Sequence, residues 1–191
     1  RQDAKLDMRF DPSSGTDTAH DLVNHHTERS LTDIIRKFGE EPKASQIARA
    51  ITRSRPVEST TDLANLIMEF TSGKYRKSKI HPATRTFQAL RMAVNSELTN
   101  LKRGLEQAIK VLNLAGRLAV ISYHSLEDRL VKNKLRQESS NCMCPPKSPV
   151  CICDHSATLR LVHKRVIKPT TEEVESNPRS RSAKLRTAER C

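Results

Sequence analysis

The sequence predicts an α/β protein in which a helical bundle precedes a region of alternating helix and strand. Four segments between residues 18 and 70 place apolar residues three or four apart, which is the period of helices packed on a core. A long helical pattern begins at Pro82, and a short apolar run at residues 118–121 follows it after Gly116. A helix that leads into a buried strand is the alternation typical of α/β sheets.

The four helices of the bundle are expected at residues 18–24, 27–38, 42–53 and 60–70, each starting at a Thr or a Pro. Residues 71–79 carry a glycine and four cationic side chains with little apolar content, so we expect a mobile loop and a domain boundary there. The interior of the bundle should be formed by Ile34, Ile35, Phe38, Ile47, Ala48, Ile51, Leu63, Leu66 and Ile67.

Pro82 suits the first turn of a long helix, which we expect to break near Asn95 and to end at Gly116. The apolar run at residues 118–121 is continuous, which predicts a strand buried on both faces.

Polar residues follow this strand at the end where open α/β sheets bind their ligands. They are Ser122, Tyr123, His124 and Ser125. Ser125 should cap the next helix, and the acidic residues 127 and 128 suit its first turn. The alternative is that His124 and Ser125 only form the turn between strand and helix, since such turns commonly carry Ser, Asp and Glu.

The segment CMCPPKSPVCIC contains four cysteines, Cys142, Cys144, Cys151 and Cys153. Four thiolates so close in sequence can hold a tetrahedral zinc ion and fix a loop with few hydrophobic residues. His155 is a spare ligand candidate. The spacing differs from the common C-x-x-C knuckle, so free thiols and disulfides remain alternatives. Cys191 stands alone and should be free.

Beyond the cysteines, residues 159–167 alternate apolar and basic side chains, which predicts a strand. A short helix capped by Thr171 should follow. Residues 180–186 are expected to form a last strand that presents alternate basic side chains on one face. A disordered basic tail is the alternative.

The charge balance favours a polyanionic partner, with 34 basic against 22 acidic residues in 191 and a net charge of +12. Nucleic acid is the natural candidate, and a merely basic, solvated surface is the alternative. No apolar run approaches the ~20 residues of a membrane span, and no signal peptide is visible. We therefore expect a cytoplasmic protein without membrane contacts.

Four blocks of the sequence resemble a known family. They are LDMRFD at residues 6–11, HPATRTFQALRMAVNSEL at 81–98, SYHSLEDR at 122–129 and NPRSRSAKLR at 177–186. In this order and spacing they look like the bacterial small-subunit ribosomal RNA cytosine-N4 methyltransferase family. The resemblance implies a class I, Rossmann-like α/β domain with an inserted helical bundle, S-adenosylmethionine as methyl donor, and a cytosine in the decoding region of small-subunit ribosomal RNA as substrate.

On this resemblance residues 1–17 and 80–191 belong to the methyltransferase domain, with a cysteine-rich loop at 142–153, and residues 18–79 form the inserted RNA-recognition domain. By chemistry and placement Asp11 and His124 are the best acceptors for the target amine, with Ser122 and Ser125 in support. The implied partner is small-subunit RNA or the assembled small subunit, and a homodimer is compatible with the sequence. The side chains expected to contact RNA are Arg9, Arg85, Arg91, Arg129, Arg179, Arg181, Lys184 and Arg186.

The cofactor turn of the family is missing from this sequence. A nucleotide-type cofactor bound to a doubly wound sheet needs a glycine-rich turn after the first strand, and the five glycines here are too far apart to make one. We therefore expect the carboxyl-terminal part of the enzyme, with the cofactor site upstream and no activity by itself. The alternative function is a non-catalytic basic RNA-binding module with a zinc-stabilised loop.

Overall fold

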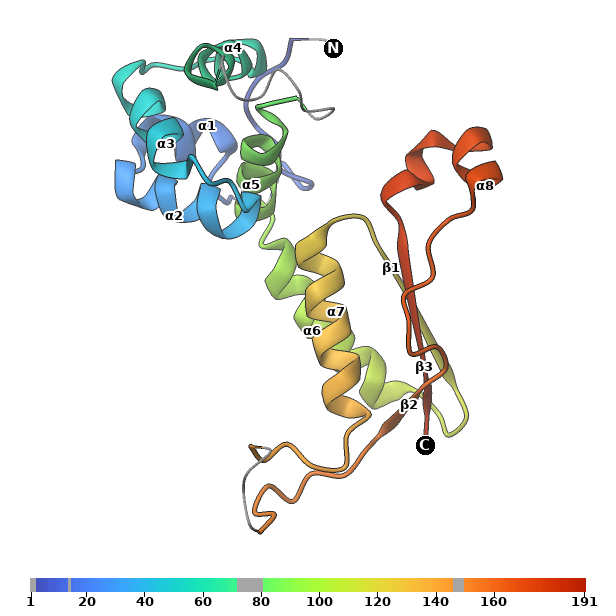
Figure 1. Ribbon diagram of the computed structural model, residues 1–191. Helices are drawn as coiled ribbons and strands as arrows, with labels where there is room; N and C mark the ends of the chain where they lie inside the picture. Colours follow the sequence, from blue (N-terminus) through green and yellow to red (C-terminus); the bar gives the residue numbers. More distant parts are fainter. Residues whose placement is uncertain (1–2, 14, 72–80, 146–149) are drawn as a thin grey trace. The chain divides into compact units, whose positions relative to one another are not determined.

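The computed structural model describes residues 3–13, 15–71, 81–145 and 150–191, which divide into two compact units, Arg1–Glu97 and Leu98–Cys191 (Figure 1). Together the described residues form an α/β structure with eight α-helices and one three-stranded sheet. None of the helices in this described part is long and apolar enough to cross a membrane. The expected loop at residues 71–79 lies almost wholly outside the described residues.

The first unit is helical. Its helices are α1 (Ala19–His25), α2 (Glu28–Gly39), α3 (Ala44–Arg53), α4 (Thr60–Thr71) and α5 (Thr84–Val94). Thr18 and Asp21 form a reciprocal capping box at the start of α1, and Thr27 caps α2 through the Ser30 N–H. The four helices predicted for the bundle are confirmed within about two residues at each end. Whether the bundle is an insertion stays a prediction, as does the three-part domain division.

The core of the first unit is aliphatic. Most of the predicted interior positions are buried, whereas Ile34, Leu66 and Phe38 are only partly so. Helix α5 also contributes Leu90 and packs against α2, so the bundle includes a fifth helix, although the sequence predicts this helix as part of the later α/β region. The predicted break after this helix is confirmed. Asn95 ends α5, and Ser96 adopts a left-handed backbone with φ 49° before α6.

The second unit places helices on one face of a small antiparallel sheet. Its elements are α6 (Glu97–Val111), β1 (Arg117–Ser122), α7 (Ser125–Glu138), β2 (Leu159–Leu161), α8 (Thr171–Ser176), a 3-10 helix η2 (Pro178–Ser182) and β3 (Lys184–Arg190). The strand order is β1-β3-β2, with β3 antiparallel to both neighbours. Figure 1 shows α6 and α7 on the same side of the sheet. Leu105, Ile109, Val131, Leu135 and Leu159 form the core between these layers.

The described residues bury β1 on one face only, whereas the sequence predicted burial on both. Its side chains alternate, with Leu118 and Val120 turned toward the helices and Ala119 and Ile121 exposed. A continuous apolar run gives no information about which face is covered, because adjacent strand residues always point to opposite sides.

Three boundaries near the carboxyl end also differ from the prediction. Strand β2 covers only Leu159–Leu161, with an isolated bridge at Ile167 further on. Thr170, one residue before Thr171, caps α8. The last strand begins at Lys184 because Asn177 and Pro178 start the 3-10 helix over the residues in front of it.

Candidate active-site and RNA-binding residues

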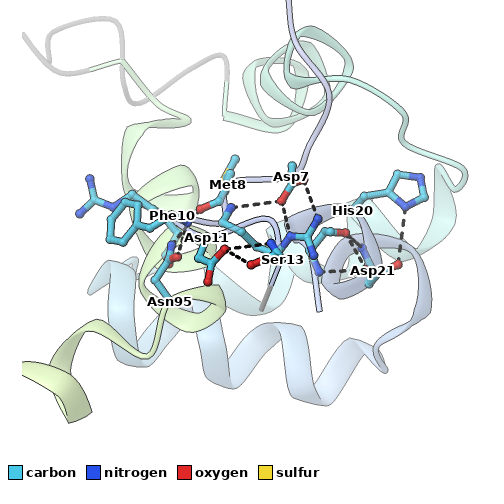
Figure 2. Close-up of polar contacts among 11 residues, drawn as sticks. Asp7, Met8, Phe10, Asp11, Ser13, His20, Asp21 and Asn95 are labelled. Carbon is cyan, nitrogen blue, oxygen red and sulfur yellow. Dashed lines mark hydrogen bonds and ion pairs between the residues drawn. The ribbon is translucent and has the colours of Figure 1, made fainter. Parts of the chain in front are cut away.

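The LDMRFD segment is fastened to the end of α5 by one side chain, that of Asn95 (Figure 2). Asn95 Oδ1 accepts a hydrogen bond from the Phe10 N–H at 2.7 Å, and Nδ2 donates to the Met8 carbonyl at 2.8 Å and to the Arg91 carbonyl at 2.9 Å. Met8 has a left-handed backbone with φ 62°, while Leu6 is buried in the core. The first two blocks of the family resemblance, 85 residues apart at this contact, therefore form one structure.

Replacing Asn95 by alanine should destabilise the first unit. The change removes three hydrogen bonds and leaves a strained segment without its support, so we expect a loss of about 1–3 kcal/mol in the free energy of unfolding. Urea denaturation followed by circular dichroism measures this loss. Asn65→Ala is the matched control, because Asn65 is an exposed residue of helix α4. Equal stability of the two variants would contradict the fastening role of Asn95.

Within this segment Asp7 and Arg9 form a two-pronged ion pair. Arg9 Nε and Nη2 donate to the Asp7 carboxylate at 2.6 and 2.9 Å. The hydrogen bond from Arg9 lowers the pKa of Asp7 to about 2, so this carboxylate stays ionised at any physiological pH. Arg9, predicted to contact RNA, is thus already paired with a carboxylate.

Asp11 is exposed, and its carboxylate is oriented by its neighbour Ser13. Asp11 Oδ1 accepts from the Ser13 N–H at 2.9 Å and from the Ser13 hydroxyl at 2.6 Å. The Ser13 hydroxyl, and after it the Ser13 N–H, lower the pKa of Asp11. Phe10 beside it is 72% exposed. The segment therefore presents an ionised acceptor and an aromatic ring to solvent.

The two arginines of α5 also have carboxylate neighbours. Arg91 donates to Glu97 in two bonds of 2.7 and 3.0 Å. Arg85 Nη1 lies 3.8 Å from Glu41 Oε2 and 3.4 Å from the Glu40 carbonyl oxygen. These contacts indicate that both arginines help to stabilise the fold.

At the end of β1, His124 and not Ser125 is the cap of α7, which corrects the prediction. His124 Nδ1 accepts from the Glu127 N–H at 3.3 Å, and its Nε2 lies 3.3 Å from Glu127 Oε1. Burial raises the pKa of Glu127, but contacts with His124 and the Tyr123 N–H lower it by more. Both ring nitrogens of His124 thus face its own helix. This arrangement supports the turn interpretation over a role as amine acceptor.

The last two blocks of the resemblance meet across β1 and β3. Ser122 lies opposite Lys184 in the sheet, and its hydroxyl is 3.4 Å from the Lys184 carbonyl. The Asp128 carboxylate, in the first turn of α7, accepts hydrogen bonds from Arg186 Nε at 2.7 Å and from Arg186 Nη2 at 3.3 Å. Lys184 Nζ lies 3.5 Å from the same carboxylate. Burial raises the pKa of Asp128, but Arg186 and then Lys184 lower it by more. Two of the predicted RNA contacts therefore neutralise a carboxylate of their own unit.

The Asp128 cluster should make the second unit sensitive to acid. Because its folded-state pKa lies below the unfolded value of about 3.9, Asp128 contributes stability above that pH, and the contribution disappears as pH falls through the folded pKa. Asp128→Asn should lower stability at pH 7 and flatten the decline in stability as pH falls below about 4. Thermal melts across this range test the prediction. Glu175→Gln, on the exposed side of α8, should leave the decline unchanged.

The remaining predicted RNA contacts lie on the surface. Arg129 is exposed on α7, and Arg179 and Arg181 are exposed on η2. Asn177 accepts from the Arg179 N–H, and Ser180 between the two arginines is buried. The 3-10 helix therefore places Arg179 and Arg181 on the surface.

The four cysteines come together in the connection between α7 and β2. Their sulfur atoms all lie within 4.8 Å of one another. N–H groups of Met143 and His155 lower the pKa of Cys153 to about 6. The Cys144 N–H lowers the pKa of Cys142, but the sulfur atoms around it raise this pKa to about 12. His155 is turned away, with Nε2 3.0 Å from the Gln137 carbonyl oxygen, so it is not a ligand in this arrangement.

Comparison with known proteins identifies the family. The model of the MraW methylase family matches residues 1–191. The chain belongs to this family. Ribosomal RNA small subunit methyltransferase H of Dehalococcoides mccartyi strain BAV1 is 52% identical over 188 residues, which are 98% of this chain and 53% of that protein. The protein of the same name from Syntrophus aciditrophicus is 52% identical, and the match covers 99% of this chain and 61% of that protein. The one from Halothermothrix orenii is 45% identical, and the match covers 100% of this chain and 62% of that protein.

The chain thus spans little more than half the length of these MraW family relatives. The four blocks that carried the resemblance form two pairs. The block at 6–11 contacts the block at 81–98, and the block at 122–129 contacts the block at 177–186. Two side chains in these pairings, Asn95 and Asp128, were not predicted as site residues, whereas their partners Lys184 and Arg186 were. An asparagine just after a helix and an acidic residue in a first turn are too common to single out.

Proposed function

We propose that this chain is the carboxyl-terminal part of an S-adenosylmethionine-dependent enzyme that methylates N4 of a cytosine in the decoding region of small-subunit ribosomal RNA. The observation that carries the proposal is the pairing of the four blocks. Segments 6–11 and 122–129 are both held in place by polar contacts to a second block distant in sequence. Packing alone does not require such polar side chains at these positions. The names of the relatives point to the same substrate, small-subunit ribosomal RNA.

The sheet of the second unit supports a larger α/β domain. In the described part of the chain, β1 pairs with a strand along one edge only, and its outer face exposes Ala119 and Ile121, the latter 57% exposed. Unpaired edges and open apolar faces are normally covered. A class I sheet that continues beyond β1, with helices on both faces, would cover both.

The residues described here do not fit a cofactor cradle. Gly15, Gly39, Gly104 and Gly116 lie far apart in sequence, and the close approaches at Gly39 and Gly116 are to the chain's own carbonyls of Arg85 and Asn113. A nucleotide-type cofactor needs a glycine turn that admits the ligand instead. We therefore assign no cofactor contact to a residue of this chain, and we infer that the methyl donor binds to the upstream part.

The contribution of this chain would then be to hold the target base. Transfer to an exocyclic amine requires that its lone pair point at the incoming methyl, which a hydrogen-bond acceptor on the amine enforces. Asp11 is the better acceptor of the two proposed, because it is exposed and ionised while His124 contacts its own helix. The unstacked cytosine also needs a stacking surface, and Phe10 is available next to Asp11.

A chimeric enzyme tests the proposal. This chain replaces the matching 188 residues of the Dehalococcoides relative, and the product is incubated with radiolabelled S-adenosylmethionine and small ribosomal subunits that lack the modification. We expect methyl incorporation that mass spectrometry identifies as N4-methylcytidine in the decoding region. Calorimetry should show cofactor binding to the chimera and none to the chain alone.

Three other outcomes would contradict parts of the proposal. A methyl group on another atom or nucleotide would refute the N4 assignment. Tight cofactor binding by the chain alone would refute the upstream cofactor site. A folded chimera that binds RNA without methylating it would favour the alternative, a non-catalytic RNA-binding module.

A further inference from the structure

The connection between α7 and β2 brings four sulfur atoms into one cluster without joining any of them. Cys151 Sγ lies 3.4 Å from Cys142 Sγ, 3.5 Å from Cys153 Sγ and 3.9 Å from Cys144 Sγ, and Cys153 Sγ lies 3.8 Å from Cys142 Sγ. A disulfide bond would require about 2.05 Å. All four side chains are free thiols in this arrangement.

These separations match the edges of a tetrahedron around a single metal ion. Four sulfur atoms about 2.3 Å from a zinc ion at the centre of a tetrahedron lie about 3.8 Å from one another. The four observed contacts scatter around that value, from 3.4 to 3.9 Å. Because all sulfur atoms lie within 4.8 Å of one another, there is room for one ion but not for a multi-atom iron–sulfur cluster.

Backbone amides around the cluster donate to sulfur. The Met143 N–H points to Cys153 Sγ at 3.2 Å, the Cys144 N–H to Cys142 Sγ at 3.4 Å, and the Ile152 N–H to Cys144 Sγ at 3.4 Å. Such bonds stabilise negative charge on thiolates, which is the form that binds metal. Three of the four sulfur atoms thus already accept a backbone N–H, as metal-bound thiolates do.

We propose that Cys142, Cys144, Cys151 and Cys153 bind one zinc ion in a closed, four-coordinate structural site. Thiolate ligands in a tetrahedral arrangement favour zinc over calcium or magnesium, and four protein ligands leave no open position for catalysis. Zinc at this site is independent of the methyl-transfer chemistry.

The role of the ion is to order the connection, whose described residues bury few apolar side chains. Its apolar side chains Met143, Val150 and Ile152 are 49%, 69% and 86% exposed. The ends of the connection are anchored, because the Thr158 N–H donates to the Glu138 carbonyl at 2.8 Å and the Thr158 hydroxyl to the Glu138 carboxylate at 2.7 Å. A zinc ion would fix the segment between these anchors and so hold the spacing from α7 to β2.

The test is metal analysis of the full 191-residue chain, purified under reducing conditions, exposed to zinc chloride and then passed over a chelating resin. We expect about one zinc per chain by mass spectrometry, and on replacement by cobalt the visible spectrum of a tetrahedral tetrathiolate site. Hydrogen exchange in residues 139–145 and 150–158 should slow when zinc is bound.

Two serine variants make the test specific. Cys151→Ser removes the sulfur with contacts to all three others, and we expect zinc affinity to fall by about a hundredfold or more. Cys191→Ser removes the exposed fifth cysteine outside the cluster and should retain full zinc binding. A wild-type chain that takes up no zinc, contains iron, or carries disulfides among these cysteines after purification would overturn the proposal. Unchanged zinc binding by Cys151→Ser would overturn it as well.

Discussion

Replacement of Asp11 by asparagine in the chimeric enzyme is expected to slow methyl transfer about a hundredfold while leaving cofactor binding unchanged. The Ser13 N–H and hydroxyl both bond to Oδ1, so an asparagine can keep that oxygen in place. Its Nδ2 then replaces the second carboxylate oxygen. A donor would thus face the amine of the target cytosine where the wild-type protein offers an acceptor, and the amine would lose its orientation.

The same contacts predict what kind of role Asp11 plays. Its pKa is lowered by Ser13, so the carboxylate is a weak base and positions the amine more than it removes a proton. The rate of the wild-type enzyme should therefore show no step from Asp11 above the pKa of an ordinary carboxyl group. Ser13→Ala, which removes one of the two bonds to Oδ1, should cost less than Asp11→Asn.

Asp33→Asn is the matched control for Asp11, because Asp33 is an exposed carboxylate on α2 outside the proposed site. Single-turnover methylation at saturating cofactor separates the effect on transfer from an effect on binding. If Asp11→Asn and Asp33→Asn transfer methyl at the same rate, Asp11 does not contact the target base.

Local signals in the sequence predicted the helices well. Thr18, Thr27 and Pro82 mark helix starts that the structure places within two residues, and the break at Asn95 is real. Periodicity and capping are properties of neighbouring residues, so a single sequence contains them. The proximity of the four cysteines follows from the same local spacing, since all lie within 12 residues of one another.

Long-range features could not be derived in this way. The apolar run before Ser122 does not reveal that Ile121 faces outward, because exposure depends on which elements cover the sheet. The contacts of Asn95 with Phe10 and of Asp128 with Arg186 join residues 85 and 58 positions apart. Nothing in either local sequence distinguishes these polar residues from solvated ones.

The sequence also does not show which basic residues are paired with carboxylates. The structure separates paired from exposed arginines. Arg9, Arg91 and Arg186 form close ion pairs with carboxylates, whereas Arg179 and Arg181 are exposed on η2. Phosphate contacts need cations that are not already neutralised, so the two arginines of η2 are the strongest candidates of the original set.

Substitution of Arg179 and Arg181 together by glutamine is therefore expected to weaken binding of a decoding-region RNA fragment about tenfold or more near 0.1 M salt. Each phosphate contact contributes about 0.7–0.9 to the slope of log affinity against log salt, so this slope should fall by about 1.4–1.8. Fluorescence anisotropy at several salt concentrations measures both quantities. Arg117→Gln with Arg160→Gln removes the same net charge from two arginines that pair with Glu189 at 3.0 and 2.5 Å. That control should change the slope little. Equal losses in both double variants would mean that overall charge, and not a contact at η2, attracts the RNA.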